Sequence, residues 1–215
     1  DRRNDQFQQF RHDPSDPDSL ASDAIRTLHI DAAGRVWAAT ERHGLDVLDP
    51  HTGHARHFHH IAGNPRSLAA DAVFALYTDR AGRLWVGTDQ GLGRYEPSSD
   101  DFNNEVAEPG ALDSARVRSI VEDHAGALWI GTFDSGVYRL DPQTRKVTSF
   151  RHDASNPRSL SNDRVRALLE DDAHRVWIAT SDGLNLFDRT SESFVRYGRD
   201  ADNPHSLRDD DVMSL

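Results

Sequence analysis

Residues 117–142, VRSIVEDHAGALWIGTFDSGVYRLDP, decide the fold, because the rest of the chain repeats this stretch. Its tryptophan recurs at spacings of 48, 44 and 48 residues, as Trp37, Trp85, Trp129 and Trp177. A leucine stands 17 residues before each tryptophan, as Leu20, Leu68, Leu112 and Leu160. Self-similarity at such a period indicates stacked supersecondary units, so the chain contains four tandem copies of a roughly 46-residue unit.

Each copy reads as short apolar segments separated by turns. In the third copy, VRSIVED ends at a turn that has Asp123 first and Gly126 last, the residue types that β-turns favour. ALWIGT follows, rich in aromatic and β-branched residues, and then come a glycine-containing turn, VYRLDP and a segment with an aromatic residue. The apolar i, i+3 pair of the first segment also suits a helix, but its shortness favours a strand. We therefore predict four antiparallel strands per copy.

The copies differ in ways that bear on the fold. His174 replaces the turn glycine in the fourth copy, which predicts strain or a different turn there, and the shorter second copy uses Phe102 as its fourth-strand aromatic. We predict a single propeller segment over residues 1–215, with blade repeats at about 20–60, 68–104, 112–152 and 160–199. By alignment, residues 7–12 are the outer strand of a preceding blade and residues 207–215 begin a fifth copy.

A four-stranded unit of this size is too small to be stable alone, so neighbours must cover both of its faces. If each interface removes roughly 400–600 Å² of apolar surface, it contributes on the order of 10 kcal/mol, an upper value. An open arc of four blades leaves two bare faces, whereas propellers close with about 4–8 blades. We expect an all-β propeller fragment of a larger ring, completed by further blades or another chain, with a homodimer as one route. A solenoid, which uses shorter repeats, is the alternative.

Composition excludes several classes of function. The formal net charge of −11 and the dispersed arginines disfavour nucleic-acid binding. The absence of cysteine removes disulfides and thiolate metal sites. No stretch approaches the about 18 apolar residues of a membrane span, so membrane contact is expected only through segments outside this chain. Only 36% of residues are hydrophobic, but the regular aromatic spacing argues against disorder.

Candidate ligand-binding positions are those that vary while the framework repeats. The residue after the inner-strand valine or isoleucine varies in this way, and the four candidates are Arg26, Phe74, Arg118 and Arg166. Arginines at a channel mouth could bind carboxylate or sulfate groups, and Phe74 offers a stacking face. Alternatively, they pair with Asp23, Asp71 and Asp163 or face solvent. Exposed turns on the same rim add four further candidates: Arg42, His43, Gln90 and Phe133.

Metal binding and catalysis have weaker signals. Residues 51–60 contain five histidines, and His57 and His59 would share one face of a strand. However, His60 aligns with His12 and His152, and no local carboxylate or thiolate completes a site, so no metal and no cofactor is predicted. There is no phosphate-binding glycine loop and no nucleophile elbow, and the repeated Trp and Asp residues read as framework. The segment is predicted to be non-catalytic.

Residues 24–49, 72–96, 116–141 and 164–188 follow the pattern V-x-x-I/L-x-x-D-x-x-G-x-L-W-I/V-G-T-x-x-G-L-x-x-Y/F-D, departing at Ala39, Ala179 and His174. The chain thus closely resembles the two-component regulator propeller repeat family. That resemblance implies a seven-bladed propeller in the extracytoplasmic, periplasmic sensor region of bacterial histidine kinases, hybrid two-component proteins or diguanylate cyclases. The ligand would be a small molecule or an oligosaccharide. A protein-interaction scaffold is an alternative, as is a lyase or hydrolase of streptogramin-lyase type, which would need His, Glu and metal ligands on one rim.

Overall fold

The computed structural model describes residues 7–104 and 106–215, and every regular element in these residues is a β-strand. The first sheet contains β1 (Ile25–Ile30), β2 (Val36–Thr40), β3 (Leu45–Leu48) and β4 (Ala55–Phe58). The second contains β5 (Val73–Thr78), β6 (Leu84–Thr88), β7 (Gly91–Glu96) and β8 (Asp101–Asn103). The third contains β9 (Val117–Glu122), β10 (Leu128–Thr132), β11 (Val137–Leu140) and β12 (Val147–Phe150). The fourth contains β13 (Val165–Glu170), β14 (Val176–Thr180), β15 (Gly183–Asp188) and β16 (Ser193–Tyr197).

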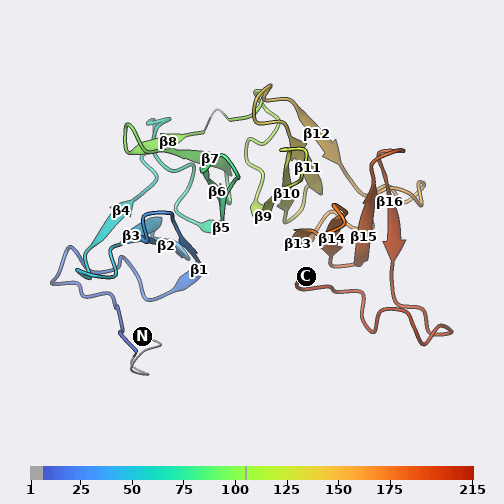
Figure 1. Cartoon of the computed structure of the whole chain (residues 1–215), viewed down its shortest axis with the longest axis horizontal. Coiled ribbons are helices and arrows are strands. Elements are labelled where there is room, and N and C mark those ends of the chain that lie inside the picture. Colours follow the sequence, from blue (N-terminus) through green and yellow to red (C-terminus); the bar gives the residue numbers. More distant parts are fainter. Residues whose placement is uncertain (1–6, 105) are drawn as a thin grey trace.

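Within each sheet the four strands pair with their sequence neighbours, and every pairing is antiparallel. The predicted four-stranded blade is therefore confirmed in all four copies. Figure 1 shows the blades side by side in an open arc, with β1, β5, β9 and β13 on the inner side. Consecutive inner strands contact one another, so they line a shared concave surface. Among the described residues, no helix could cross a membrane.

Three of the four tryptophans are buried between blades, as their framework role requires. The Trp37 ring packs edge-on against Tyr95 of the next blade, with ring centres 4.8 Å apart, and Trp129 meets Phe187 in the same way at 4.6 Å. Trp85 instead packs in a cluster with Leu140 of the third blade. These contacts fix each blade against its neighbour by aromatic and aliphatic packing. Trp177 differs, because it is only half-buried and faces no following blade.

The repeated aspartate holds each β-turn and the tryptophan that follows it. In the second blade, Asp79 Oδ1 accepts the backbone N–H of Ala81 and Arg83, while its Oδ2 accepts the Trp85 Nε1–H at 2.8 Å. The other three blades repeat this Trp-to-Asp bond at 2.8–3.0 Å. In the fourth blade the bond from Trp177 lowers the pKa of Asp171 to about 2. Turn capping by aspartate, as predicted, thus explains the constant Asp–Trp spacing.

The turn at His174 keeps the geometry of the other copies and carries strain. Its φ is +60°, in the left-handed region that glycine occupies at Gly34, Gly82 and Gly126. The His174 N–H donates to the Asp171 carbonyl at 2.8 Å, the bond that the glycines make in their own turns. The sequence predicts either strain or a different turn at His174. The structure shows strain in an unchanged turn.

Residues 7–12, expected as the outer strand of a preceding blade, form no strand among the described residues. A strand needs a hydrogen-bonded neighbouring strand, and the described part of the chain supplies none beside residues 7–12. Residues 207–215 contain no strand either, and their expected place at the start of a fifth copy stays a prediction. Phe10 still packs against a buried cluster that includes Leu20 and Leu48, so the first segment contacts the face of the first blade. At the other end, the Val212 N–H donates to the Thr180 carbonyl at 3.1 Å.

Candidate functional site: arginines and phenylalanines at the channel mouth

The four predicted channel-mouth residues all stand at β-bulges. In each inner strand the pairing skips the second residue, which leaves Arg26, Phe74, Arg118 and Arg166 without a partner in the ladder. A bulge residue leaves the regular alternation of the strand, and bulges at sheet rims re-aim side chains. Because consecutive inner strands lie side by side, the four bulges bring their side chains to one rim of the arc.

Guanidinium groups surround two phenylalanine rings on this rim. The guanidinium carbon of Arg26 lies 4.5 Å from the centre of the Phe74 ring, and that of Arg118 lies 4.8 Å from it. Arg118 is also 4.8 Å from the centre of the Phe133 ring. Arg116 and Arg164 lie 4.3 and 4.5 Å from the same ring. We call these six residues the arginine cluster; cation–π contacts of this kind hold the charged groups in place.

The cluster concentrates positive charge. Burial lowers the pKa of Arg118, and the charges of Arg26, Arg116, Arg166 and Arg164 lower it further. Two of the arginines have acidic partners: Arg26 lies 3.4 Å from Glu41, and Arg166 makes two bonds of 3.1 Å to Asp211. Like charges held together in a partly buried place repel one another. A bound anion would relieve that repulsion, so the site is electrostatically suited to an anionic ligand.

A cavity of about 530 Å³ opens beside the cluster, a size typical of small-molecule sites. Five of the predicted residues line it: Arg26, Arg42, Phe74, Gln90 and Arg118. Asp89 also lines it, and the buried Oδ1 of this side chain has no hydrogen-bond partner among the described residues. A ligand hydroxyl or N–H group could supply the missing donor. Glu41 and Asp71 line the cavity as well, so it offers guanidinium donors together with three carboxylates, of which Asp89 has the unpartnered oxygen.

The remaining predicted residues are not part of the cavity lining. Phe133 adjoins the cavity through its contact with Arg118, whereas Arg166 is held by Asp211. His43 is exposed in its turn, where its backbone N–H donates to Thr40 Oγ1 at 2.8 Å. The structure therefore brings six of the eight predicted residues into or beside one cavity.

The alternative in which the arginines pair with the connector aspartates is wrong for those partners. Asp23, Asp71 and Asp163 accept the backbone N–H groups of three equivalent histidines, at 2.6–2.8 Å. These are His12, His60 and His152, whose Nδ1 atoms also contact a leucine carbonyl in each copy. His60 is thus part of the repeat, as predicted.

Two residues of the cluster were missing from the sequence prediction. Arg116 and Arg164 stand immediately before the inner-strand valines, where the first two copies have Ala24 and Ala72. This variation was visible in the sequence, because the position changes from alanine to arginine while its neighbours repeat. Only the three-dimensional structure shows that both side chains turn toward Phe133.

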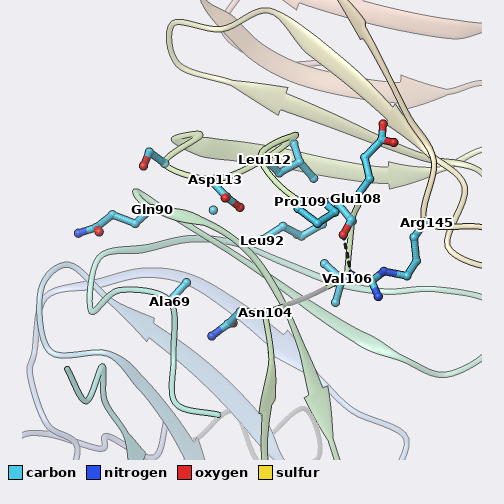
Figure 2. Close-up of a pocket in the computed structure, with 13 residues that line it drawn as sticks. Ala69, Gln90, Leu92, Asn104, Val106, Glu108, Pro109, Leu112, Asp113 and Arg145 are labelled. Atoms are coloured by element: carbon cyan, nitrogen blue, oxygen red, sulfur yellow. Dashed lines mark hydrogen bonds between the residues drawn. The ribbon is translucent and has the colours of Figure 1, made fainter. Parts of the chain in front are cut away.

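A second cavity of about 520 Å³ lies between the second and third blades, against the irregular connector around residues 106–114. Figure 2 shows Gln90 at one end of this cavity and Arg145 at the other. Arg145 is held by a 2.8 Å bond to the Ala107 carbonyl. Gln90 lines both cavities, so the second one adjoins the arginine cluster along the same rim.

The histidine-rich segment has a structural role in the fold. His57 Nδ1 lies 2.7 Å from Asp46 Oδ1, and its Nε2 lies 3.0 Å from the Pro17 carbonyl, so both ring nitrogens are engaged. Burial alone would lower the pKa of His57, but the bonds to Asp46 and Pro17 outweigh it and raise the pKa. The ring of His59 stands 6.3 Å away, measured between ring centres. His57 therefore links β4 to β3 and to the N-terminal segment.

Comparison with known proteins agrees with this architecture. The family model described as two component regulator propeller matches residues 67–90, 111–134 and 159–182, in the second, third and fourth copies. These segments are two-component regulator propeller repeats. No curated protein sequence matches the chain significantly.

Several solved structures share the propeller fold. One is the extracellular domain of the putative hybrid two-component system BT3049 from B. thetaiotaomicron, with a TM-score of 0.74 and 22% identity over 94% of this chain and 32% of that one. The corresponding domain of BT4673 has a TM-score of 0.74 and 18% identity over 94% and 25%. Virginiamycin B lyase from Staphylococcus aureus has a TM-score of 0.62 and 11% identity over 83% and 56%. The chain spans about a third of the length of the first of these extracellular domains and a quarter of the second.

Proposed function

We propose that this chain is a non-catalytic ligand-sensing segment of an extracytoplasmic signalling protein, and that it binds an anionic ligand at the arginine cluster. The observation that carries the proposal is the position of Arg118. Its guanidinium group contacts two phenylalanine rings and is close enough to four other arginines for their charges to lower its pKa. Such a concentration of charge favours ligands with carboxylate, sulfate or phosphate groups.

The chemistry of the cluster suits binding better than catalysis. Guanidinium groups donate hydrogen bonds and remain protonated, so they hold an anion without exchanging protons with it. Phe74 and Phe133 hold the guanidinium planes in place and present apolar faces beside them. A small molecule or an oligosaccharide that carries acidic groups would use both features.

The proposed signalling role rests on the type of repeat and on the proteins whose structures are similar. The repeats are of the two-component regulator type, and two similar solved structures are extracellular domains of hybrid two-component systems. We therefore place the chain in the periplasm or outside the cell, with a histidine kinase or diguanylate cyclase domain elsewhere in the natural protein. Ligand binding between blades would change their packing, and that change would pass to the output domain.

Further blades, or another chain, are the proposed partners of the two bare faces. Leu28 and Ile30 on the first blade are 61% and 67% exposed, whereas the corresponding Leu76 packs against the blade before it. At the other end Tyr197 is 42% exposed beside the half-buried Trp177. Apolar faces of this kind are normally covered in a closed ring.

Matched pairs of ligands test the anion proposal. Thermal shift of the chain would be measured with glucuronate against glucose, and with citrate and sulfate against glycerol. We expect stabilisation by at least one acidic compound and none by its neutral counterpart, because only the acidic form neutralises the cluster. If neutral and acidic compounds gave equal shifts, or if Arg118→Ala left the acid-specific shift unchanged, the proposal would be wrong.

A further inference from the structure

A second group of functional side chains lies on the opposite rim, between the third and fourth blades. His124 stands in the turn between β9 and β10, Glu170 ends β13, and His174 stands in the turn between β13 and β14. One possible ligand atom from each residue lies within 4.8 Å of the other two. Among residues 7–104 and 106–215, these three form the one group of histidine and acidic side chains whose ligand atoms are close enough to share a metal ion.

Two of these residues already meet across the blade interface. His124 Nδ1 lies 2.7 Å from Glu170 Oε1, and the His124 backbone N–H donates to the same oxygen at 2.9 Å. The backbone bond has a counterpart one blade earlier, where the Arg80 N–H donates to Glu122 Oε2 at 2.7 Å. The carboxylate is therefore a normal element of blade stacking, but the imidazole facing it is specific to this interface.

His174 adds a second imidazole at a conformational cost. It takes the left-handed backbone, with φ of +60°, that three glycines take in the other copies, and a side chain is rarely found there. The turn does not require histidine, since glycine makes the same turn without strain. The side chain stacks on His124 instead, with ring centres 4.5 Å apart and planes inclined by 27°.

We infer that His124, Glu170 and His174 bind a divalent transition-metal ion of the zinc class, which ties the third blade to the fourth. Two imidazole nitrogens and one carboxylate oxygen are a ligand set that zinc accepts, and a water molecule would complete a tetrahedral site. Ligand atoms around zinc stand about 3.3 Å apart, given bonds of about 2.0–2.2 Å. His124 and His174 are exposed, so their rings can turn to close the present separations.

Arg189 marks the place that the ion would take. Its Nη2 lies 3.3 Å from His124 Nδ1 and 3.4 Å from Glu170 Oε1, while its Nη1 donates to Asp123 Oδ2 at 3.0 Å. The metal would displace Nη2 and leave the bond to Asp123 as the anchor of the side chain. Because the guanidinium competes with the metal, Arg189→Gln should bind the ion more tightly than the unchanged chain.

Zinc titration of the chelator-treated chain tests the site, with Co²⁺ absorption as a spectroscopic check of ligand number. We expect one ion per chain. His174→Gly removes a ligand and restores the residue of the other three copies, so it should weaken binding at least 10-fold while leaving the metal-free chain as stable or more stable. Glu170→Gln should weaken binding as well. At a zinc concentration about 100 times Kd of the unchanged chain, its melting temperature should rise by about 5–10 °C, and that of His174→Gly should rise by less.

A double variant of exposed histidines in the first blade, His51→Ala with His54→Ala, is the matched control and should keep full affinity. Zinc binding by His174→Gly within threefold of the unchanged chain would overturn the inference, as would loss of binding in the double variant. The anion titrations are independent of this result, because the two sites lie on opposite rims.

Discussion

The guanidinium carbon of Arg118 lies 4.8 Å from the ring centre of Phe74, a residue that stands on a different blade at the equivalent β-bulge. Two features of the sequence produce this contact: the position of the bulge and the residue that occupies it. The repeat fixes where each bulge falls, and the variable residue at the bulge decides the chemistry. Adjacent inner strands thus present, at one rim, the residues that differ between copies. This is how a repetitive framework positions a specific site.

Removing the ring between two arginines should weaken anion binding. Phe74→Ala removes two cation–π contacts, each of about 0.5–1 kcal/mol, and leaves Arg26 and Arg118 without a fixed position. We expect the affinity for the acidic ligand to fall about 5- to 30-fold, as measured by calorimetry. Phe102→Leu, at a buried aromatic in the outer strand of the same blade, is the control for general destabilisation. Equal losses in both variants would contradict a local role for Phe74.

Salt should weaken the same interaction. The proposed ligand is held by charge in a cavity that opens to solvent, so raising the ionic strength from about 0.01 to 0.15 M shortens the screening length and lowers affinity. Titration at several salt concentrations should give a steady fall in affinity. A salt-independent affinity would mean that the ligand is held by apolar contacts.

The turn aspartates should make the free energy of unfolding depend on pH in the acidic range. Burial alone would raise the pKa of Asp79, but the bonds from Trp85 and Arg83 outweigh it and hold the pKa below its ordinary value. A carboxyl group with a depressed folded-state pKa stabilises the fold above its unfolded-state pKa of about 3.9, and this contribution is lost as pH falls through the folded-state value. Asp79→Asn should therefore lose about 1–3 kcal/mol at pH 7 in urea unfolding. The difference should shrink below about pH 4; a difference independent of pH would contradict this account.

The bare face of the first blade should drive association. Ile30 is 67% exposed and Leu28 is 61% exposed, so a charged residue at Ile30 costs the isolated chain little. We expect the chain to associate as its concentration rises, and Ile30→Lys to prevent this while leaving the melting temperature nearly unchanged. Sedimentation velocity of the unchanged chain and of Ile30→Lys, each over a range of concentrations, measures this association. A strictly monomeric unchanged chain at high concentration would show that these faces do not bind one another.

The repeat determines what the sequence can predict here. The Asp79–Trp85 bond, the four-stranded blades and the positions of Arg26, Phe74 and Arg118 follow from local spacing, which the sequence shows directly. The approach of Arg164 to Phe133 joins residues of different blades, and it depends on how the blades stack. The same is true of His124 and His174, which are 50 residues apart and meet only through blade packing. The direction of the exposed His43 side chain depends on one turn and could not be read from spacing.

The central claim is that the arginine cluster binds an anion, and calorimetry on two arginine variants tests it most directly. Arg118→Ala removes the guanidinium held between Phe74 and Phe133, whereas Arg66→Ala removes the same charge from an exposed ion pair with Asp101 on the outer strand of the second blade. With the acidic ligand that gives the largest thermal shift, we predict at least a 10-fold loss of affinity for Arg118→Ala and less than a twofold change for Arg66→Ala. Equal affinities for the two variants would contradict the claim.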